Sequence, residues 1–393
     1  MTDSIVIVSA ARTPMGSFQG EFSSLAAHDL GGAAIKAAVE RAGIAGDSVN
    51  EVLFGNCLMA GQGQAPARQA AFKGGLPISA GAVTLSKMCG SGMRAAMFGH
   101  DMLLAGSADV VVAGGMESMT NAPYLLQKAR GGYRIGHDRV MDHMMLDGLE
   151  DAYEAGRSMG TFGEDCAAKY GFTREQQDSF AITSVQRAQA ATQSGAFAAE
   201  ITPVTIKGRA GDKVISIDEA PGKVKLEKIP TLKPAFKKDG TITAASSSSI
   251  NDGAAALVLT RASTAKTLGA TPIARIVGHA TFAQAPEWFT TAPVGAVQKL
   301  LKKIGWQVGD VDLWEINEAF AVVPMAAMKE LGISHDIVNV NGGACALGHP
   351  IGASGARIIV TLLYALKARG LKKGVATLCI GGGEGTALAI ELL

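Results

Sequence analysis

Four residues lie in segments where their side chains could carry out nucleophilic and proton-transfer chemistry. The first, Cys89, follows an expected strand over residues 81–88 and precedes an expected helix over residues 94–104, with Gly90 and Gly92 just after it. Unpaired N–H groups and the positive dipole end at a helix N-terminus favour a thiolate. The position therefore suits a nucleophile. Taken alone, a cysteine in such a turn is more often a small buried hydrophobic residue.

The second is His349, which lies between Gly348 and Pro350 in a glycine-rich loop. An expected helix over residues 356–368 follows this loop. A lone histidine usually has a structural role, but this imidazole lies at a helix entrance and not on an apolar face. Because histidine exchanges protons near neutral pH, the position favours acid–base chemistry.

Cys379 and Asn317 complete the set. Cys379 ends an apolar strand that is followed by three glycines. It is either a core cysteine or part of a site, since α/β sheets place their sites at the carboxyl ends of parallel strands. Asn317 precedes an expected helix over residues 321–331. Its amide either caps that helix or fixes a water or a carbonyl group.

The elements that must position these residues alternate between apolar strands and helices. This alternation predicts a parallel or mixed sheet with helices on both faces. Residues 374–384 repeat the pattern of residues 109–117, namely an apolar strand, glycines and a glutamate, and residues 387–392 repeat residues 255–259. We therefore expect two similar α/β halves. The expected early strands are 5–10, 51–55 and 109–117, and the expected early helices are 29–42 and 61–74.

An insertion separates the two halves. Residues 121–249 hold many charges, a polar helix expected over residues 173–194, and prolines at positions 221, 230 and 234. We assign residues 1–120 to the first half, completed by residues 250–270, and residues 271–393 to the second half.

Composition excludes several classes of function. The chain has 393 residues, 48% hydrophobic content and a net charge of +1, so it has no basic surface for nucleic acid or anionic membranes. Its five cysteines show neither paired nor metal-ligand spacing, which predicts no disulfide framework, no metal site and a reducing compartment. We expect neither a signal peptide nor a transmembrane segment, and we expect a soluble cytoplasmic protein.

Four short motifs together resemble those of the thiolase superfamily. In order along the chain they are Cys89-Gly90-Ser91-Gly92, Asn317-Glu318-Ala319-Phe320, Gly348-His349-Pro350 and Cys379-Ile380-Gly381. Four motifs in one order are far more specific than any one of them, and the similarity covers essentially the whole chain. The resemblance implies the α/β thiolase fold, with duplicated five-layer α/β/α/β/α halves and an inserted loop domain for CoA binding and tetramerisation.

The resemblance also implies a mechanism. Cys89, activated by His349, would accept an acetyl group from acetyl-CoA, and the backbone N–H groups of Cys89 and Gly381 would hold the thioester oxygen. Cys379 would remove a proton from a second acetyl-CoA, whose enolate oxygen His349 and a water on Asn317 would stabilise. The products would be acetoacetyl-CoA and CoA, formed reversibly by a ping-pong Claisen condensation without any further cofactor.

Within the family, residues 130–149 resemble the covering and tetramerisation segment of acetoacetyl-CoA thiolases, which are acetyl-CoA C-acetyltransferases. This favours a homotetramer, a dimer of dimers, with acetyl-CoA, acetoacetyl-CoA and CoA as ligands. The alternative is a 3-ketoacyl-CoA thiolase of β-oxidation that acts on longer chains. A non-catalytic CoA-binding relative would not need all four motifs, and a cysteine hydrolase has no use for Cys379.

Further residues are expected to contact the substrate. Ser248 falls where the family contacts pantetheine, and Lys223 and Lys225 are candidates for the CoA phosphates, although a solvated surface accounts for either lysine equally well. Other residues carried over as substrate contacts are Leu149, Met159, Phe289, Ala319 and Phe320. The chain departs from the family at residues 245–249, at Ser158 (often His) and at Phe289 (often Met), which leaves the acyl-chain preference open.

Overall fold

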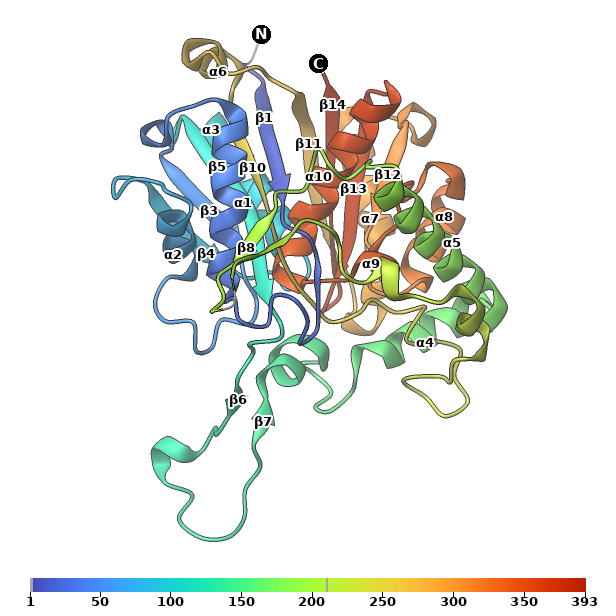
Figure 1. Ribbon diagram of the computed structural model, residues 1–393. Coiled ribbons are helices and arrows are strands. Elements are labelled where there is room, and N and C mark those ends of the chain that lie inside the picture. Colours follow the sequence, from blue (N-terminus) through green and yellow to red (C-terminus); the bar gives the residue numbers. More distant parts are fainter. Residues whose placement is uncertain (1–2, 210) are drawn as a thin grey trace.

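The two halves of the chain form sheets with the same strand order. The computed structural model describes residues 3–209 and 211–393 (Figure 1). In the first half the order is β4-β3-β5-β10-β1, in which β4, β3 and β5 are parallel and β10 and β1 are antiparallel to their neighbours. These strands are β1 (Ile5–Arg12), β3 (Glu51–Gly55), β4 (Gly81–Leu85), β5 (Val110–Ser118) and β10 (Asn251–Arg261), with the short β2 (Gly16–Ser17) paired to β10.

The second half repeats this arrangement. Its order is β12-β13-β14-β11, and β11 pairs with β1 so that the two sheets are continuous. Val338 forms a parallel bridge to Trp314 of β12, in the place that β4 holds in the first half. The strands are β11 (Ala274–Ala283), β12 (Leu313–Ile316), β13 (Lys373–Ile380) and β14 (Glu384–Leu392). The predicted duplication is confirmed, because β13 and β14 correspond to β5 and β10.

The helices form three layers around these sheets. α1 (Ala27–Ala42) and α2 (Pro66–Lys73) cover the outer face of the first sheet. α7 (Ala292–Ile304) packs on the outer face of the second sheet, with α8 (Val322–Leu331) beside it. α3 (Ser91–Leu104) and α10 (Ile351–Arg369) pack against each other and against strands of both halves. The predicted five layers are therefore present, and the two halves share the middle one.

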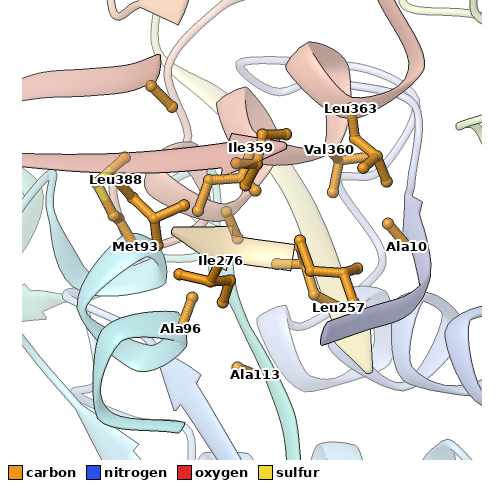
Figure 2. Close-up of a cluster of buried hydrophobic side chains, with 14 of the residues drawn as sticks. Ala10, Met93, Ala96, Ala113, Leu257, Ile276, Ile359, Val360, Leu363 and Leu388 are labelled. Carbon is orange, nitrogen blue, oxygen red and sulfur yellow. The ribbon is translucent and has the colours of Figure 1, made fainter. Parts of the chain in front are cut away.

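The shared middle layer contains one of the two largest clusters of the core. Figure 2 shows Met93 of α3 and Ile359 of α10 gathered with Leu257 of β10 and Leu388 of β14. α10 is long and apolar enough by composition to cross a membrane. However, 83% of its most apolar window is buried between the sheets, as in the core helix of a globular domain.

Glycines allow the two middle helices to approach closely at their N-terminal ends. A Cβ atom on Gly355 of α10 would lie 2.4 Å from the backbone nitrogen of Met93. A Cβ atom on Gly92 of α3 would lie 2.7 Å from the backbone nitrogen of Ala356. This packing overrides the low helix propensity of glycine. Both helices therefore begin earlier than predicted, at Ser91 and Ile351.

The insertion leaves the sheet after β5 and returns at β10. β6 (Tyr124–Leu125) and β7 (Met141–Asp142) form the base of an arm that extends away from the body of the molecule (Figure 1). α4 (Met159–Tyr170), α5 (Arg174–Gln193), β8 (Val204–Ile206) and β9 (Lys213–Ile215) follow. α5 agrees with the predicted polar helix and is capped by Thr173, which accepts a hydrogen bond from the N–H of Gln176.

Candidate active site

A small cavity of about 60 Å³ lies where the N-terminal ends of α3 and α10 meet. It joins segments from both halves and from the insertion, and most of the predicted site residues line it. The lining residues are Met88, Cys89, Gly148, Leu149, Met159, Ser248, Phe289, Ala319, Phe320, His349, Ile351 and Gly381.

Cys89 occupies the turn between β4 and α3. The preceding residue, Met88, has a φ of 44°, a strained backbone conformation, and β4 ends at Leu85, earlier than predicted. A Cβ atom on Gly90 would lie 2.4 Å from the side chain of Ile380, so only glycine fits this turn without a shift. The nucleophile candidate is thus held in place by the close approach of the second half.

Burial controls the protonation of the Cys89 thiol. Desolvation raises its pKa to about 11, although the backbone N–H groups of Gly381 and of Cys89 itself act in the opposite direction. The expectation that the helix N-terminus makes Cys89 a thiolate is therefore wrong for the free protein. A base must remove the proton before the sulfur can attack.

His349 has the protonation state of such a base. Burial and the charge of Arg357 lower the pKa of its imidazole to about 3, so the ring is neutral. Its Nδ1 lies 2.5 Å from Ser354 Oγ, which itself donates to the carbonyl oxygen of Pro350 at 2.9 Å. Because the Ser354 hydroxyl hydrogen is donated to Pro350, His349 Nδ1 carries its own hydrogen and donates it to Ser354 Oγ. Nε2 therefore carries the lone pair.

The backbone conformation of Gly348 orients the loop that carries His349. Its φ of 96° lies in the region that favours glycine, and a Cβ atom would lie 2.0 Å from Asn251 Oδ1. The backbone N–H of His349 donates to the carbonyl oxygen of Ser249 at 3.2 Å and to Asn251 Oδ1 at 3.3 Å. The histidine loop is thus fastened to the start of β10.

Cys379 and Asn317 are buried behind the residues that line the inner cavity. Cys379 is fully buried near the end of β13, and desolvation together with the nearby sulfur of Cys89 raises its pKa well above the ordinary value. Asn317 does not cap a helix as one reading of the sequence allowed, because α8 begins only at Val322. Its Nδ2 lies 3.4 Å from His349 Nε2, and its buried Oδ1 has no partner among residues 3–209 and 211–393.

Glu117 is a residue of the site that the sequence analysis did not single out as functional. Its carboxylate accepts hydrogen bonds from the backbone N–H groups of Cys57, Leu58 and Gly352 at 3.0, 3.1 and 2.9 Å. Burial nevertheless raises its pKa to about 7. It links the end of β3 to the first turn of α10. The available signal was a glutamate that ends a buried apolar strand just after two glycines.

Ser354, the partner of His349 Nδ1, was also not predicted. It lies five residues after the histidine, in the first turn of α10. The contact between Ser354 and His349 was not predicted, because the helix was expected to start only at residue 356. The early start of the helix brings the serine under the imidazole.

Three connected cavities lead from the surface to Cys89. Ser248 and His349 line both the inner cavity and a middle cavity of about 260 Å³, which Ser158 also lines. Ser249 and Ile250 line both the middle cavity and an outer one of about 740 Å³. The Ser248 N–H donates to the carbonyl oxygen of Ala319 at 3.0 Å, so residues 247–248 form one wall of this path.

The predicted lysines lie at the outer cavity. Lys223, Lys225 and Lys228 line it, away from the inner cavity. Lys223 Nζ lies 2.6 Å from Glu219 Oε1, so its charge is already paired. Lys225 and Lys228 make no salt bridge with any residue in the described part of the chain.

The comparisons with known proteins agree with this architecture. Residues 5–263 match the family described as "Thiolase, N-terminal domain" and residues 270–392 match "Thiolase, C-terminal domain". An acetyl-CoA acetyltransferase from Chromobacterium violaceum is 50% identical over 98% of this chain and 99% of its own.

Solved structures of related proteins also match the whole chain. The acetyl-CoA acetyltransferase of Bacillus anthracis superposes with a TM-score of 0.97 at 42% identity, covering 100% of this chain and 99% of its own. The Acat5 thiolase of Ascaris suum, in complex with coenzyme A, has a TM-score of 0.93 at 43% identity, covering 99% of this chain and 100% of its own. The chain described here therefore belongs to the thiolase family.

Proposed function

We propose that this protein is an acetyl-CoA acetyltransferase that condenses two acetyl-CoA molecules reversibly to acetoacetyl-CoA and CoA. The observation that carries the proposal is the meeting of two thiols and a neutral imidazole at one small cavity. Cys89 and His349 line this cavity, and Cys379 lies close enough behind it for the Cys89 sulfur to raise the pKa of the Cys379 thiol.

The first half-reaction forms an acetyl-cysteine. His349 Nε2 takes the proton of Cys89, and the sulfur attacks the thioester carbon of acetyl-CoA. The N–H groups of Cys89 and Gly381, which lie beside this sulfur, are suited to hold the developing oxyanion. The departing CoA sulfur takes the proton of Cys379. This step leaves acetylated Cys89, an imidazolium and a Cys379 thiolate.

The second half-reaction forms the carbon–carbon bond. The Cys379 thiolate is a strong base, because its pKa is well above the ordinary cysteine value, and it removes the α-proton of a second acetyl-CoA. The His349 imidazolium donates a hydrogen bond to the enolate oxygen. A water that also donates to Asn317 Oδ1 would provide a second hydrogen bond to the enolate oxygen. The enolate carbon attacks the acetyl group, and the released Cys89 sulfur recovers its proton from His349. No cofactor besides CoA itself is needed.

The dimensions of the inner cavity favour an acetyl group over longer acyl chains. Its volume of about 60 Å³ is bounded by the large side chains of Met159, Phe289 and Phe320. Phe162 packs edge-on against Phe289 at 6.0 Å, which holds that wall in place. Thiolysis rates on acetoacetyl-CoA and 3-ketodecanoyl-CoA test this point. Preference for the longer substrate would favour the β-oxidation alternative.

Isotope transfer tests the proposed reaction. Incubation with acetyl-labelled acetyl-CoA should place the label on Cys89, and Cys89→Ala should abolish it. Cys166→Ala is the matched control, because Cys166 is a buried cysteine that lines none of the three cavities, and this variant should keep the label. Label on another residue, or release of free acetate as the main product, would contradict the proposal.

We also propose where the partners lie. CoA would extend through the middle and outer cavities, with Ser248 beside pantetheine and Lys225 and Lys228 better placed than the paired Lys223 for its phosphates. The arm around β6 and β7 would join a homotetramer. All five cysteines are free, in keeping with a cytoplasmic location, and neither nucleic acid nor a membrane is an expected partner.

A further inference from the structure

A cluster of two imidazoles and one carboxylate joins α3 to β11, distant from the catalytic cavity. His100 and Asp101 lie near the C-terminal end of α3, and His100 is about 14 Å along the helix from its first residue, Ser91, at 1.5 Å per residue. His279 lies on β11, 178 residues further along the chain than Asp101. The cluster therefore connects the first half of the molecule to the second.

The three donor atoms point at one another. His279 Nε2 lies 2.9 Å from Asp101 Oδ1 and 3.3 Å from His100 Nδ1. His100 Nδ1 lies 3.1 Å from the same Asp101 oxygen. Such a compact triangle brings two imidazole nitrogens together, which is unfavourable if both are protonated.

These separations suit a tetrahedral metal ion. Zinc holds imidazole nitrogens and carboxylate oxygens at about 2.0–2.1 Å, which places neighbouring ligand atoms roughly 3.3 Å apart in a tetrahedron. The observed triangle of 2.9, 3.1 and 3.3 Å needs only small shifts to match this geometry. A water would complete the fourth position.

Burial and charge also fit an ion. The side chains of His279 and His100 are 8% and 12% exposed, whereas Asp101 is 54% exposed, so an ion can enter from the Asp101 side. Lys303, whose Nζ donates to the His279 carbonyl oxygen at 3.2 Å, opposes a dication, so the Asp101 carboxylate is essential.

We propose that His100, Asp101 and His279 form a binding site for a divalent transition-metal ion, with zinc as the best match to the donor set. Spacing along the chain predicted no such site, because the ligands come together only through the fold. The ion would crosslink α3 to β11 and stabilise the junction of the two halves. Without an ion, the same atoms are limited to hydrogen bonds between the imidazoles and the carboxylate.

Metal titration of the full-length protein tests whether this cluster binds an ion or contains only hydrogen bonds. After removal of metals with a chelator, zinc should bind with a stoichiometry of about one ion per chain, measured by competition with a chromophoric chelator. His100→Gln and His279→Gln should each weaken binding at least about tenfold, by analogy with the losses seen when the supporting shell of a metal site is altered. His28→Gln is the matched control, since His28 Nδ1 lies 3.9 Å from Asp29 Oδ1 and no third ligand completes a group there within the described part of the chain.

Two further measurements separate this site from metal binding at the catalytic thiols and from a general effect on folding. Cobalt bound at this site should lack the near-ultraviolet charge-transfer absorption of thiolate ligands, which would appear if Cys89 or Cys379 held the ion. Zinc should raise the thermal midpoint of the native protein but not that of Asp101→Asn, which should stay folded because the side chain is exposed. Absence of binding, equal affinity in the His100 variant, or a purely thiolate-type cobalt spectrum would overturn the proposal.

Discussion

At the scale of single residues, burial decides the protonation of the site. Desolvation keeps Cys89 a thiol and His349 a neutral imidazole, with pKa values of about 11 and about 3. The pair therefore rests uncharged, and charge separation is deferred until acetyl-CoA excludes water and supplies an electrophile. The Ser354 hydroxyl selects the useful tautomer of the imidazole.

Replacement of Ser354 tests this tautomer argument. Ser354→Ala leaves His349 Nδ1 without its acceptor, so the ring loses its orientation and Nε2 no longer presents a lone pair to Cys89. We expect kcat to fall about 10–100-fold with little change in KM, because misplacement of a catalytic group has effects of this size. Steady-state thiolysis of acetoacetyl-CoA measures both constants. Ser263→Ala on the distant α6 (Ala262–Leu268) should have no effect.

Glu117 predicts a pH dependence of stability. Its pKa is raised from 4.5 to about 7 in the folded protein, so the folded state holds a proton that the unfolded chain has already released. The contribution of protonated Glu117 to the stability of the folded state is complete below pH 4.5 and is lost as the pH rises through 7. Within this window the free energy of unfolding should fall by up to about 1.4 kcal/mol per pH unit from this group alone.

Chemical denaturation at several pH values measures this slope. Glu117→Gln cannot ionise and should reduce the slope between pH 5 and 7 relative to the native protein. An exposed carboxylate, Asp310→Asn, serves as the control and should leave the slope unchanged. Equal slopes in the native protein and in the Glu117→Gln variant would contradict the role of burial at this residue.

At the scale of elements, the close crossing of α3 and α10 assembles the site. Each helix begins just after one of the two groups proposed to react, Cys89 or His349, and glycines remove the side chains that would keep the helices apart. The two helices hold equivalent places in the duplicated halves. The proposed nucleophile and its proposed base thus come from corresponding positions of a repeated unit.

Addition of one methyl group at the crossing should disturb both stability and catalysis. Gly355→Ala places a Cβ atom 2.4 Å from the backbone nitrogen of Met93, which cannot move without shifting α3. We expect a loss of about 1–3 kcal/mol in the free energy of unfolding, as for other overpacked cores, and a lower kcat. Urea denaturation and thiolysis assays measure these changes. At Gly309 an added Cβ atom would meet nothing within 4 Å, so Gly309→Ala is the control.

At the scale of the whole molecule, a buried ion-pair network fastens the insertion to the first sheet. Arg12 of β1 contacts Glu200 through Nε at 2.5 Å and Asp218 through both terminal guanidinium nitrogens at 2.7 and 2.8 Å. All three side chains are buried. Since residues around Lys223 and Ser248 line the cavities that lead to Cys89, this network also holds the access path in place.

Removal of the central cation should destabilise the protein strongly. Arg12→Met leaves Glu200 and Asp218 as buried carboxylates without their partner, and breaking such a pair costs about 3–5 kcal/mol. The partly exposed pair of Arg275 and Glu391 provides the matched control, because Arg275→Met should cost less than about 1 kcal/mol. Denaturation midpoints of the two variants should differ clearly. Similar losses would show that burial of the network has no special effect.

The class of fold, the duplication and the four motifs follow from the amino-acid sequence, because strand and helix periodicity and short motifs are local properties. The sequence by itself did not determine the ionisation of Cys89, the roles of Glu117 and Ser354, or the meeting of His279 with His100. Those depend on desolvation and on contacts between residues distant in the chain. Only the tertiary structure brings the ends of α3 and α10 together and buries the charges that surround them.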